Sequence, residues 1–316
     1  MPSLRRPSVR ALSLLALLGL TALSACRRGA GEGEGVGPGA VAGAAAGPGK
    51  RPVVAVSVAP QAELVERLAA GAVEVITMIP PGTDVETYAP SPHQMAVFST
   101  ARIYFEVGHP GLPLEASYLA PWLARHPEVR RVSLAVHAGE ILPLEAVHAG
   151  GHPHGDPHLW VSVRVLRGAA VELAGALAEL LPAEADSIRT RARALDAELA
   201  ALDAEIALRF RGSEGRRFLV YHPALGYFAR DYGLVQEALE TDGKEPSPAR
   251  LAELVESARR AGVRVVLSQR GMPPRSVEIL AATLGAKVIE IDPLAADGIA
   301  NLRRIAAAVG AALIDG

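Results

Sequence analysis

Histidine and carboxylate side chains follow the predicted strands of this chain of 316 residues. Glu86 lies in the stretch PPGTDVETYAPSP after one strand, and His109 follows another. His158 ends a long loop, while His222 and Asp292 come directly after two further strands. Imidazole and carboxylate groups together suit a divalent first-row metal ion. Because the carboxyl ends of parallel strands converge on one crevice, these five residues predict a metal site.

Short apolar, β-branched runs alternate with helical patterns and predict the elements that carry these residues. One helical pattern, SPARLAELVESARRAG, has Ser247 as its N-cap and Gly262 as its stop signal. Such alternation predicts parallel sheets covered by helices. The predicted strands are 53–58, 73–79, 102–107 and 130–134 in the first half, and 217–221, 235–239, 263–268 and 287–291 in the second.

A long amphipathic pattern separates the two halves. Apolar residues recur every three or four positions between Ala183 and Phe210, with charged residues between them, which predicts one long helix. Pro182 separates this helix from the preceding one at 163–181. A closed eight-stranded barrel would not usually hold such a helix in its middle. We therefore expect an α/β protein with two lobes, each with a mainly parallel four-stranded sheet and flanking helices, joined by one long rigid helix.

The first 25 residues have the three-part form of a secretory signal. A basic stretch precedes the apolar run ALSLLALLGLTALSA, which is shorter than the roughly 18 residues that a membrane-spanning helix needs. LSAC resembles the bacterial lipobox, which implies that Cys26, the only cysteine, becomes the lipid-modified first residue of the mature protein. The alternative is an uncleaved anchor followed by a chance cysteine.

Residues 26–52 are mostly Gly, Ala, Pro and Glu, a composition that predicts a flexible, lipid-anchored linker. We expect an exported protein, lipid-anchored to a membrane and facing the periplasm or the cell exterior. The net charge of −2 and the lack of a long basic run after the signal argue against a nucleic-acid partner. The predicted organisation is a lipoprotein signal at 1–25, the linker at 26–52, an N-terminal metal-binding lobe at 53–162, a helical linker at 163–212 and a C-terminal metal-binding lobe at 213–316.

Several motifs occur in an order and spacing that resemble the zinc and manganese ABC-transporter solute-binding lipoproteins, the cluster A-I type of metal-binding receptor. They are PPGTDVETYAPSP, DPHLW, YHPALGYFARDYGL, GKEPSPARL and IDPLA. The resemblance runs from about residue 53 to 312. It implies two α/β lobes joined by one long helix, with a divalent metal ion held between them. It also implies delivery of that ion to an ABC permease and its ATPase, and we expect the receptor to be a monomer.

The resemblance implies as ligands His158 in DPHLW, His222 in YHPALGYF and Asp292 in IDPL. Where many family members have a histidine in the proline-rich loop, this chain has Glu86. If Glu86 coordinates, two imidazoles and two carboxylates would tolerate Mn²⁺ or Fe²⁺. If His109 coordinates instead, three imidazoles and one carboxylate favour tetrahedral Zn²⁺. We favour His109 and Zn²⁺, because a second imidazole at a neighbouring strand end can replace the missing one.

In the stretch GGHPHGDPHLW at 150–160, we expect one histidine to be held in place and the others to lie in a flexible segment. His158 lies where the loop re-enters the fold, so it can be held rigidly, with Trp160 packed behind it. The other histidines lie among glycines and prolines that fix no geometry, and closing a flexible chain on a metal costs conformational entropy. We expect a metal-collecting loop of weak, exchanging sites, or alternatively an inert loop; its histidines are His148, His152 and His154.

Two other functions compete with metal transport. A metal-dependent hydrolase would use Glu86 as general base and keep one metal position open for water. The sequence has neither an HExxH motif nor a nucleophile elbow. A lipid-anchored adhesin or organic-ligand receptor on the same scaffold would leave the five polar residues without a metal. We therefore predict a binding protein and not an enzyme.

Overall fold

The computed structural model of the chain describes residues 51–139, 155–240, 245–270 and 275–314, all within the compact unit Ala46–Gly316. The predicted signal and linker lie outside these residues, as do Cys26 and the loop histidines His148, His152 and His154. Among the described residues, no helix is both long and apolar enough to cross a membrane. The predicted domain boundaries stay predictions.

The first sheet is fully parallel, as its β-branched strands and intervening helices predict. Its strands pair in the order β2-β1-β3-β4. The short, buried β1 lies at the centre beside β3, so Val54 and Ile103 are paired within the core. The strands are β1 (Val53–Val56), β2 (Glu74–Thr77), β3 (Ala101–Glu106) and β4 (Arg130–Ser133).

Helices and short turns connect these strands. Ser91 caps the helix that follows the proline-rich loop, because its hydroxyl accepts the Gln94 backbone N–H. The connecting elements are α1 (Ala59–Ala69), α2 (Pro92–Phe98), the π-helix η1 (Leu114–Leu119), α3 (Ala120–Leu123), and the 3-10 turns η2 (Ala135–His137) and η4 (Leu159–Val161).

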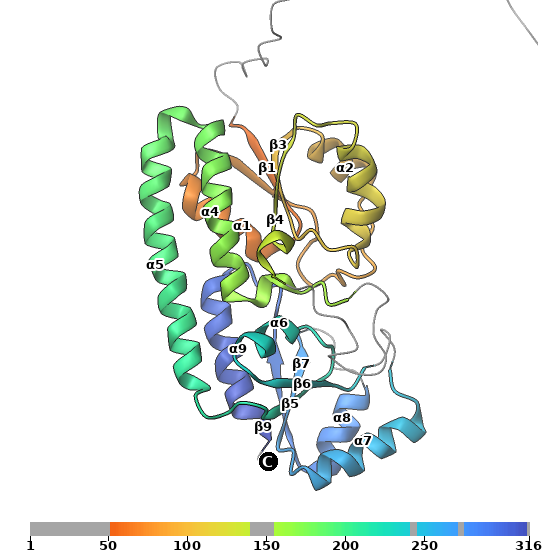
Figure 1. Cartoon of the computed structure of the whole chain (residues 1–316). Helices are drawn as coiled ribbons and strands as arrows, with labels where there is room; N and C mark the ends of the chain where they lie inside the picture. Colours follow the sequence, from red (N-terminus) through yellow and green to blue (C-terminus); the bar gives the residue numbers. More distant parts are fainter. Residues whose placement is uncertain (1–50, 140–154, 241–244, 271–274, 315–316) are drawn as a thin grey trace, which may run out of the picture. The chain divides into compact units, whose positions relative to one another are not determined.

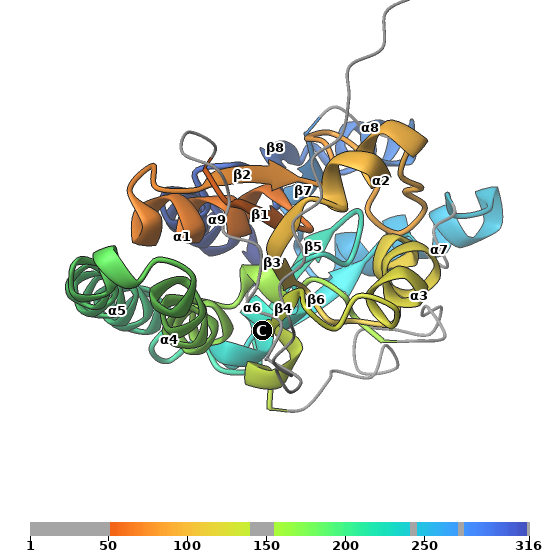
Figure 2. The same ribbon diagram turned by 90° about the horizontal axis from the view of Figure 1, so that it is seen from above.

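Two long antiparallel helices follow the first lobe. They are α4 (Val163–Leu180) and α5 (Ala185–Arg209), separated by the 3-10 turn η5 (Pro182–Glu184). They lie on one side of the first sheet, and α2 lies on the opposite side (Figures 1 and 2). Helix α5 contacts α1 of the first lobe and also α9 (Gly298–Ala312) of the second. The predicted linking helix is therefore confirmed.

The second sheet repeats the first and adds one strand. Four parallel strands pair in the order β6-β5-β7-β8, and a short final strand pairs antiparallel with β5. That final strand was not predicted, because two residues carry no periodicity. The elements are β5 (Arg217–Val220), α6 (Gly226–Asp231), β6 (Val235–Ala238), α7 (Pro248–Arg260), β7 (Val265–Gln269), α8 (Arg275–Leu284), β8 (Lys287–Ile291) and β9 (Leu313–Ile314).

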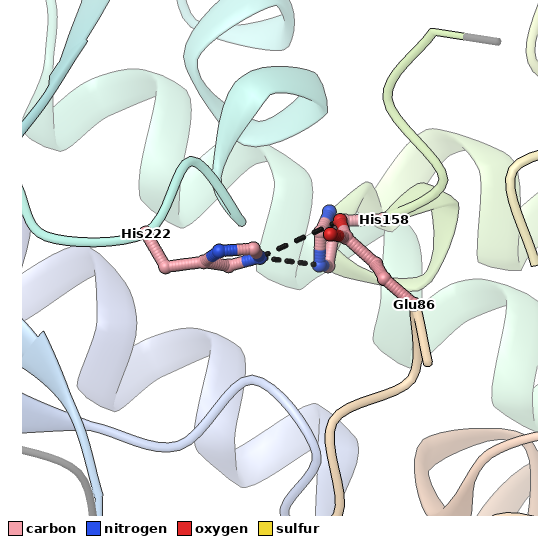
Figure 3. A group of neighbouring side chains, drawn as sticks. All are labelled: Glu86, His158 and His222. Atoms are coloured by element: carbon pink, nitrogen blue, oxygen red, sulfur yellow. Dashed lines mark hydrogen bonds and ion pairs between the residues drawn. The ribbon is translucent and has the colours of Figure 1, made fainter. Parts of the chain in front are cut away.

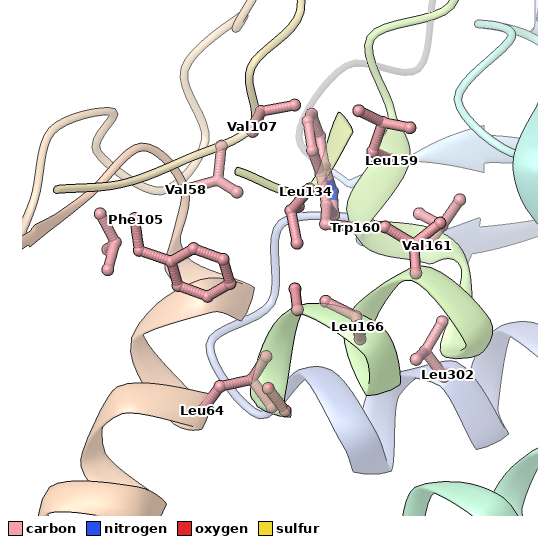
Figure 4. Packing of buried hydrophobic residues seen from close by; sticks show 14 of the residues in the cluster. Val58, Leu64, Phe105, Val107, Leu134, Leu159, Trp160, Val161, Leu166 and Leu302 are labelled. Atoms are coloured by element: carbon pink, nitrogen blue, oxygen red, sulfur yellow. The ribbon is translucent and has the colours of Figure 1, made fainter. Parts of the chain in front are cut away.

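One hydrophobic cluster runs through both lobes. Trp160 lies within it, near Leu134 of the first lobe and Leu166 of α4 (Figure 4). Leu302 of α9 belongs to the same cluster. The Trp160 indole N–H also donates to the carbonyl oxygen of Pro293 at 3.0 Å. Because a continuous packed core resists separation, we expect the two lobes to stay together around the site.

Candidate metal centre

Glu86, His158 and His222 converge on one point. One ligand atom from each residue lies within 4.8 Å of the corresponding atoms of the other two. Figure 3 shows His222 approaching from one side, and Glu86 and His158 approaching from the other. The first two belong to the first lobe and His222 to the second, so the group lies between the lobes.

A local turn positions Glu86. The loop that follows β2 turns back at Asp84, whose Oδ1 accepts the Glu86 backbone N–H at 2.9 Å. The other oxygen of Asp84 accepts the Thr87 hydroxyl at 2.9 Å. This is the turn that an aspartate side chain makes with its own following backbone. It places Glu86 at the mouth of the site, and its side chain is 8% exposed.

A neighbouring aspartate orients His158. Asp156 Oδ1 accepts both the His158 backbone N–H and the ring Nδ1, each at 2.8 Å. Both side chains are buried, and the Trp160 ring packs against His158 at a centroid separation of 5.1 Å. With Nδ1 bound to a carboxylate, the second ring nitrogen, Nε2, faces the other two ligands.

The imidazole of His222 has the same kind of support from a residue distant in sequence. His222 follows β5, and Glu240 follows the adjacent parallel strand β6. Both Glu240 oxygens lie 3.2 Å from His222 Nδ1. The Glu240 backbone N–H donates to the carbonyl oxygen of Tyr221 at 3.0 Å, which fixes the glutamate beside the histidine.

The two Nε2 atoms face each other at 3.4 Å. Ionised carboxylates only accept hydrogen bonds, so in the neutral rings each Nδ1 carries the proton and each Nε2 presents a lone pair. Tetrahedral zinc bonded to two nitrogens at about 2.0–2.1 Å holds them roughly 3.3–3.4 Å apart. The Glu86 Oε1 to His222 Nε2 distance of 3.6 Å also fits a shared ion. The arrangement can hold one small divalent cation.

The charges around the site also favour a cation. Burial alone would lower the pKa of His222, but the nearby carboxylates of Glu240, Glu86 and Asp84 raise it above its ordinary value. A cavity of about 210 Å³ opens onto the ligands. This cavity is lined by Thr83, Asp84, Val85, Glu86, His158, Trp160, Tyr221, His222, Glu240, Gln269, Pro293 and Leu294.

Asp292 does not join the three-residue group within the described part of the chain. Its Oδ1 accepts the Leu294 backbone N–H at 3.1 Å, and its carbonyl oxygen accepts the Asn301 side-chain amide at 2.7 Å. It lines a different cavity, whereas the next two residues, Pro293 and Leu294, line the metal-site cavity. In this arrangement Asp292 shapes the turn that borders the site.

His109 also lies apart from the group. It is buried, and its Nδ1 accepts the Gly111 backbone N–H at 3.0 Å. It lines a separate cavity with Glu106 and Glu115. Among the described residues, the structure thus brings Glu86, and not the favoured His109, into the group with the two histidines.

Two important residues, Asp156 and Glu240, were not predicted as part of the site. Asp156 stands in the quoted motif DPHLW, two residues before His158, at the spacing that lets a side chain bond to the following backbone N–H. Glu240 directly follows the predicted strand 235–239. The rule that selected His222 and Asp292, a polar residue just after a strand, would have selected Glu240 as well.

Comparisons with known proteins identify the family of this chain. The family described as "Zinc-uptake complex component A periplasmic" matches residues 54–305. A protein of Treponema pallidum (strain Nichols), whose assigned name refers to metal binding, is 31% identical over 256 residues, covering 76% of this chain and 78% of that protein.

Solved structures of ZnuA also resemble this fold. A crystal structure of ZnuA has a TM-score of 0.74 at 32% identity, covering 83% of this chain and 99% of that one. A zinc-bound deletion mutant of ZnuA has a TM-score of 0.72 at 32% identity, covering 84% and 100%. The chain therefore belongs to the periplasmic zinc-uptake component A family, whose members are metal-binding, non-enzymatic solute-binding proteins of ABC import.

Proposed function

We propose that this protein captures Zn²⁺ through Glu86, His158 and His222 and delivers it to an ABC permease driven by its ATPase. The observation that carries the proposal is the pair of Nε2 atoms 3.4 Å apart, with each Nδ1 held by a carboxylate. Two lone pairs at that distance repel each other unless a cation or a proton lies between them. Glu86 supplies negative charge on the same side.

Zinc is preferred over Mn²⁺ and Fe²⁺ in this proposal. Two imidazoles favour zinc, and the ordering of divalent metals gives Zn²⁺ an intrinsic advantage over both alternatives. The single carboxylate of the group is compatible with all three ions. Chelator competition on the whole protein should therefore give tighter binding of Zn²⁺ than of Mn²⁺ or Fe²⁺. If the protein retained Mn²⁺ more tightly than Zn²⁺, Mn²⁺ would become the proposed cargo in place of zinc.

Asp292 remains a candidate fourth ligand. The turn that it shapes borders the metal-site cavity through Pro293 and Leu294, so a rotation of the carboxylate towards the ion would complete four-fold coordination. Zinc affinity of Asp292→Asn separates the possibilities. A large loss supports coordination, and unchanged affinity assigns the aspartate to the turn alone. His109→Ala, which changes a residue lining a separate cavity, serves as the comparison.

The receptor works outside the cytoplasm, as its family does. We place it on a membrane through an acyl chain at Cys26, followed by the linker at 26–52 and acting as a monomer beside the permease. Fractionation of cells that express Cys26→Ser tests the anchor, since the protein should leave the membrane fraction. Retention in that fraction would contradict acylation as the anchor.

The loop histidines His148, His152 and His154 are proposed to collect metal near the site. Deletion of residues 148–154 should leave the zinc affinity nearly intact, because the three converging ligands remain. It should slow zinc uptake by metal-starved cells. An uptake rate equal to that of the intact protein would show that the loop plays no part in uptake.

A further inference from the structure

We propose that Glu240 is a positioning residue of the metal site, which holds the His222 ring so that Nε2 faces Glu86 and His158. This inference deepens the proposed zinc binding and rests on it. No motif in the sequence identified Glu240, and it is not one of the three converging residues. Its role follows from its contacts with His222 and Tyr221.

Glu240 is attached to the His222 segment at two points. Its backbone N–H donates to Tyr221 O at 3.0 Å, just beyond the parallel pairing of β5 with β6. Its carboxylate accepts from His222 Nδ1, with both oxygens at 3.2 Å. The Glu240 side chain is 8% exposed, so few water molecules compete for this bond. The sheet therefore determines where the His222 proton lies.

The position of that proton decides whether His222 can bind a metal. A neutral imidazole carries its proton on one nitrogen and a lone pair on the other. A carboxylate at Nδ1 keeps the proton there and leaves the Nε2 lone pair facing His158 and Glu86. Without Glu240, the ring could also carry its proton on Nε2, where an N–H cannot coordinate. Glu240 thus selects the tautomer and the ring orientation together.

Zinc affinity of three variants tests this role. Glu240→Ala and Glu240→Met both remove the acceptor, and the methionine keeps the length of the side chain in case the alanine variant folds poorly. Each should bind zinc roughly 10–100-fold more weakly than the wild type. Glu240→Gln should recover most of the affinity, because its amide oxygen can accept the same Nδ1–H.

Glu237→Gln is the matched control. Glu237 lies on β6 and pairs with Arg217 at 2.7 Å on the exposed side of the sheet, so its substitution should leave zinc affinity unchanged. Thermal unfolding of the zinc-free forms measures any general loss of structure. Nitrogen-15 NMR of the histidine rings in the zinc-free proteins gives an independent signature: the wild type should show His222 protonated at Nδ1, and Glu240→Met should show a mixture of the two tautomers.

The outcomes separate the inference from the function beneath it. If the wild type and Glu240→Met bind zinc equally tightly and show the same His222 tautomer, Glu240 is not a positioning residue, and the proposed function stands. If the wild type does not bind zinc, the proposed function fails and this inference fails with it. Weak binding by Glu240→Met, recovery in Glu240→Gln and normal binding by Glu237→Gln would together establish the role.

Discussion

The two histidines of the site are supported in opposite ways. His158 is held by Asp156, two residues earlier, and the two short bonds belong to one local turn. His222 is held by Glu240, which lies 18 residues later, just after a neighbouring strand, through longer bonds. The His158 side chain is 3% exposed and that of His222 is 13% exposed. The first support needs only a few residues of chain, whereas the second needs the pairing of β5 with β6.

This difference indicates which side of the site is fixed and which side can move. The His158 side is built into the common core through Trp160, so it provides the fixed reference. The His222 side depends on the register between β5 and β6, so a small shift of one strand along the other would alter the position of the His222 ring. Because one core joins both lobes, we expect metal release by such local shifts and not by wide separation of the lobes.

Removing either imidazole should have the largest effect on metal binding. His158→Ala and His222→Ala each delete one of the proposed ligands, so each should lose more zinc affinity than the roughly 10–100-fold that follows loss of an orienting partner. Chelator competition measures the affinity. His126→Ala, an exposed histidine paired with Glu128, should bind zinc normally. If one of these two variants bound zinc as tightly as the wild type, that histidine would not be a ligand of the same importance as the other.

Loss of Trp160 should remove the rigidity of the His158 side. Trp160→Ala deletes a buried indole and its bond to Pro293, so the free energy of unfolding should fall by about 3–5 kcal/mol. Urea unfolding of the zinc-free protein measures this change. Trp122→Ala, at a half-buried position in the same lobe, should have a smaller effect. Equal losses would mean that His158 has no special packing support.

Asp156→Ala sharpens the comparison between the two carboxylates. Asp156 fixes both the ring and the backbone of His158, so its loss should weaken zinc binding roughly 10–100-fold. The effect should match or exceed that of Glu240→Ala. Asp196→Ala, which removes an exposed partner of Arg167, provides the baseline. A smaller effect than that of Glu240→Ala would reverse the ranking of the two supports.

An effect of pH on stability, separate from metal binding, is expected in the first lobe. Burial raises the pKa of Glu115 to about 7, although its carboxylate accepts the backbone N–H groups of Val107 and Gly108. The native state therefore keeps this proton up to a higher pH than the unfolded chain. As the pH rises from about 4.5 to about 7, the free energy of unfolding should fall by at most about 1.4 kcal/mol per pH unit.

Glu115→Gln isolates this contribution. Glutamine cannot ionise, so the variant should lose the part of the pH dependence that lies in that window, even if its overall stability is lower. Urea unfolding at several pH values measures both chains. Parallel curves for the wild type and the variant would show that Glu115 has an ordinary pKa.

Local patterns predicted much of the fold. The spacing of apolar residues predicts α5, and β-branched runs predict the eight parallel strands to within two residues at each end. The strand β9 escaped prediction because its place depends only on pairing with β5. Polar residues after strands indicated the region of the site, including Glu86, His158 and His222.

The sequence by itself determined the two-lobed α/β fold, the linking helix and the packing of Trp160 behind His158, since all of these follow from periodicity or from residues a few positions apart. Only the tertiary structure decided that Glu86 meets the histidines, that His109 lies apart and that Glu240 holds His222. Those choices depend on how distant loops approach one another across the gap between the lobes. A linear pattern shows which groups could coordinate a metal, but the distance between them is set by packing.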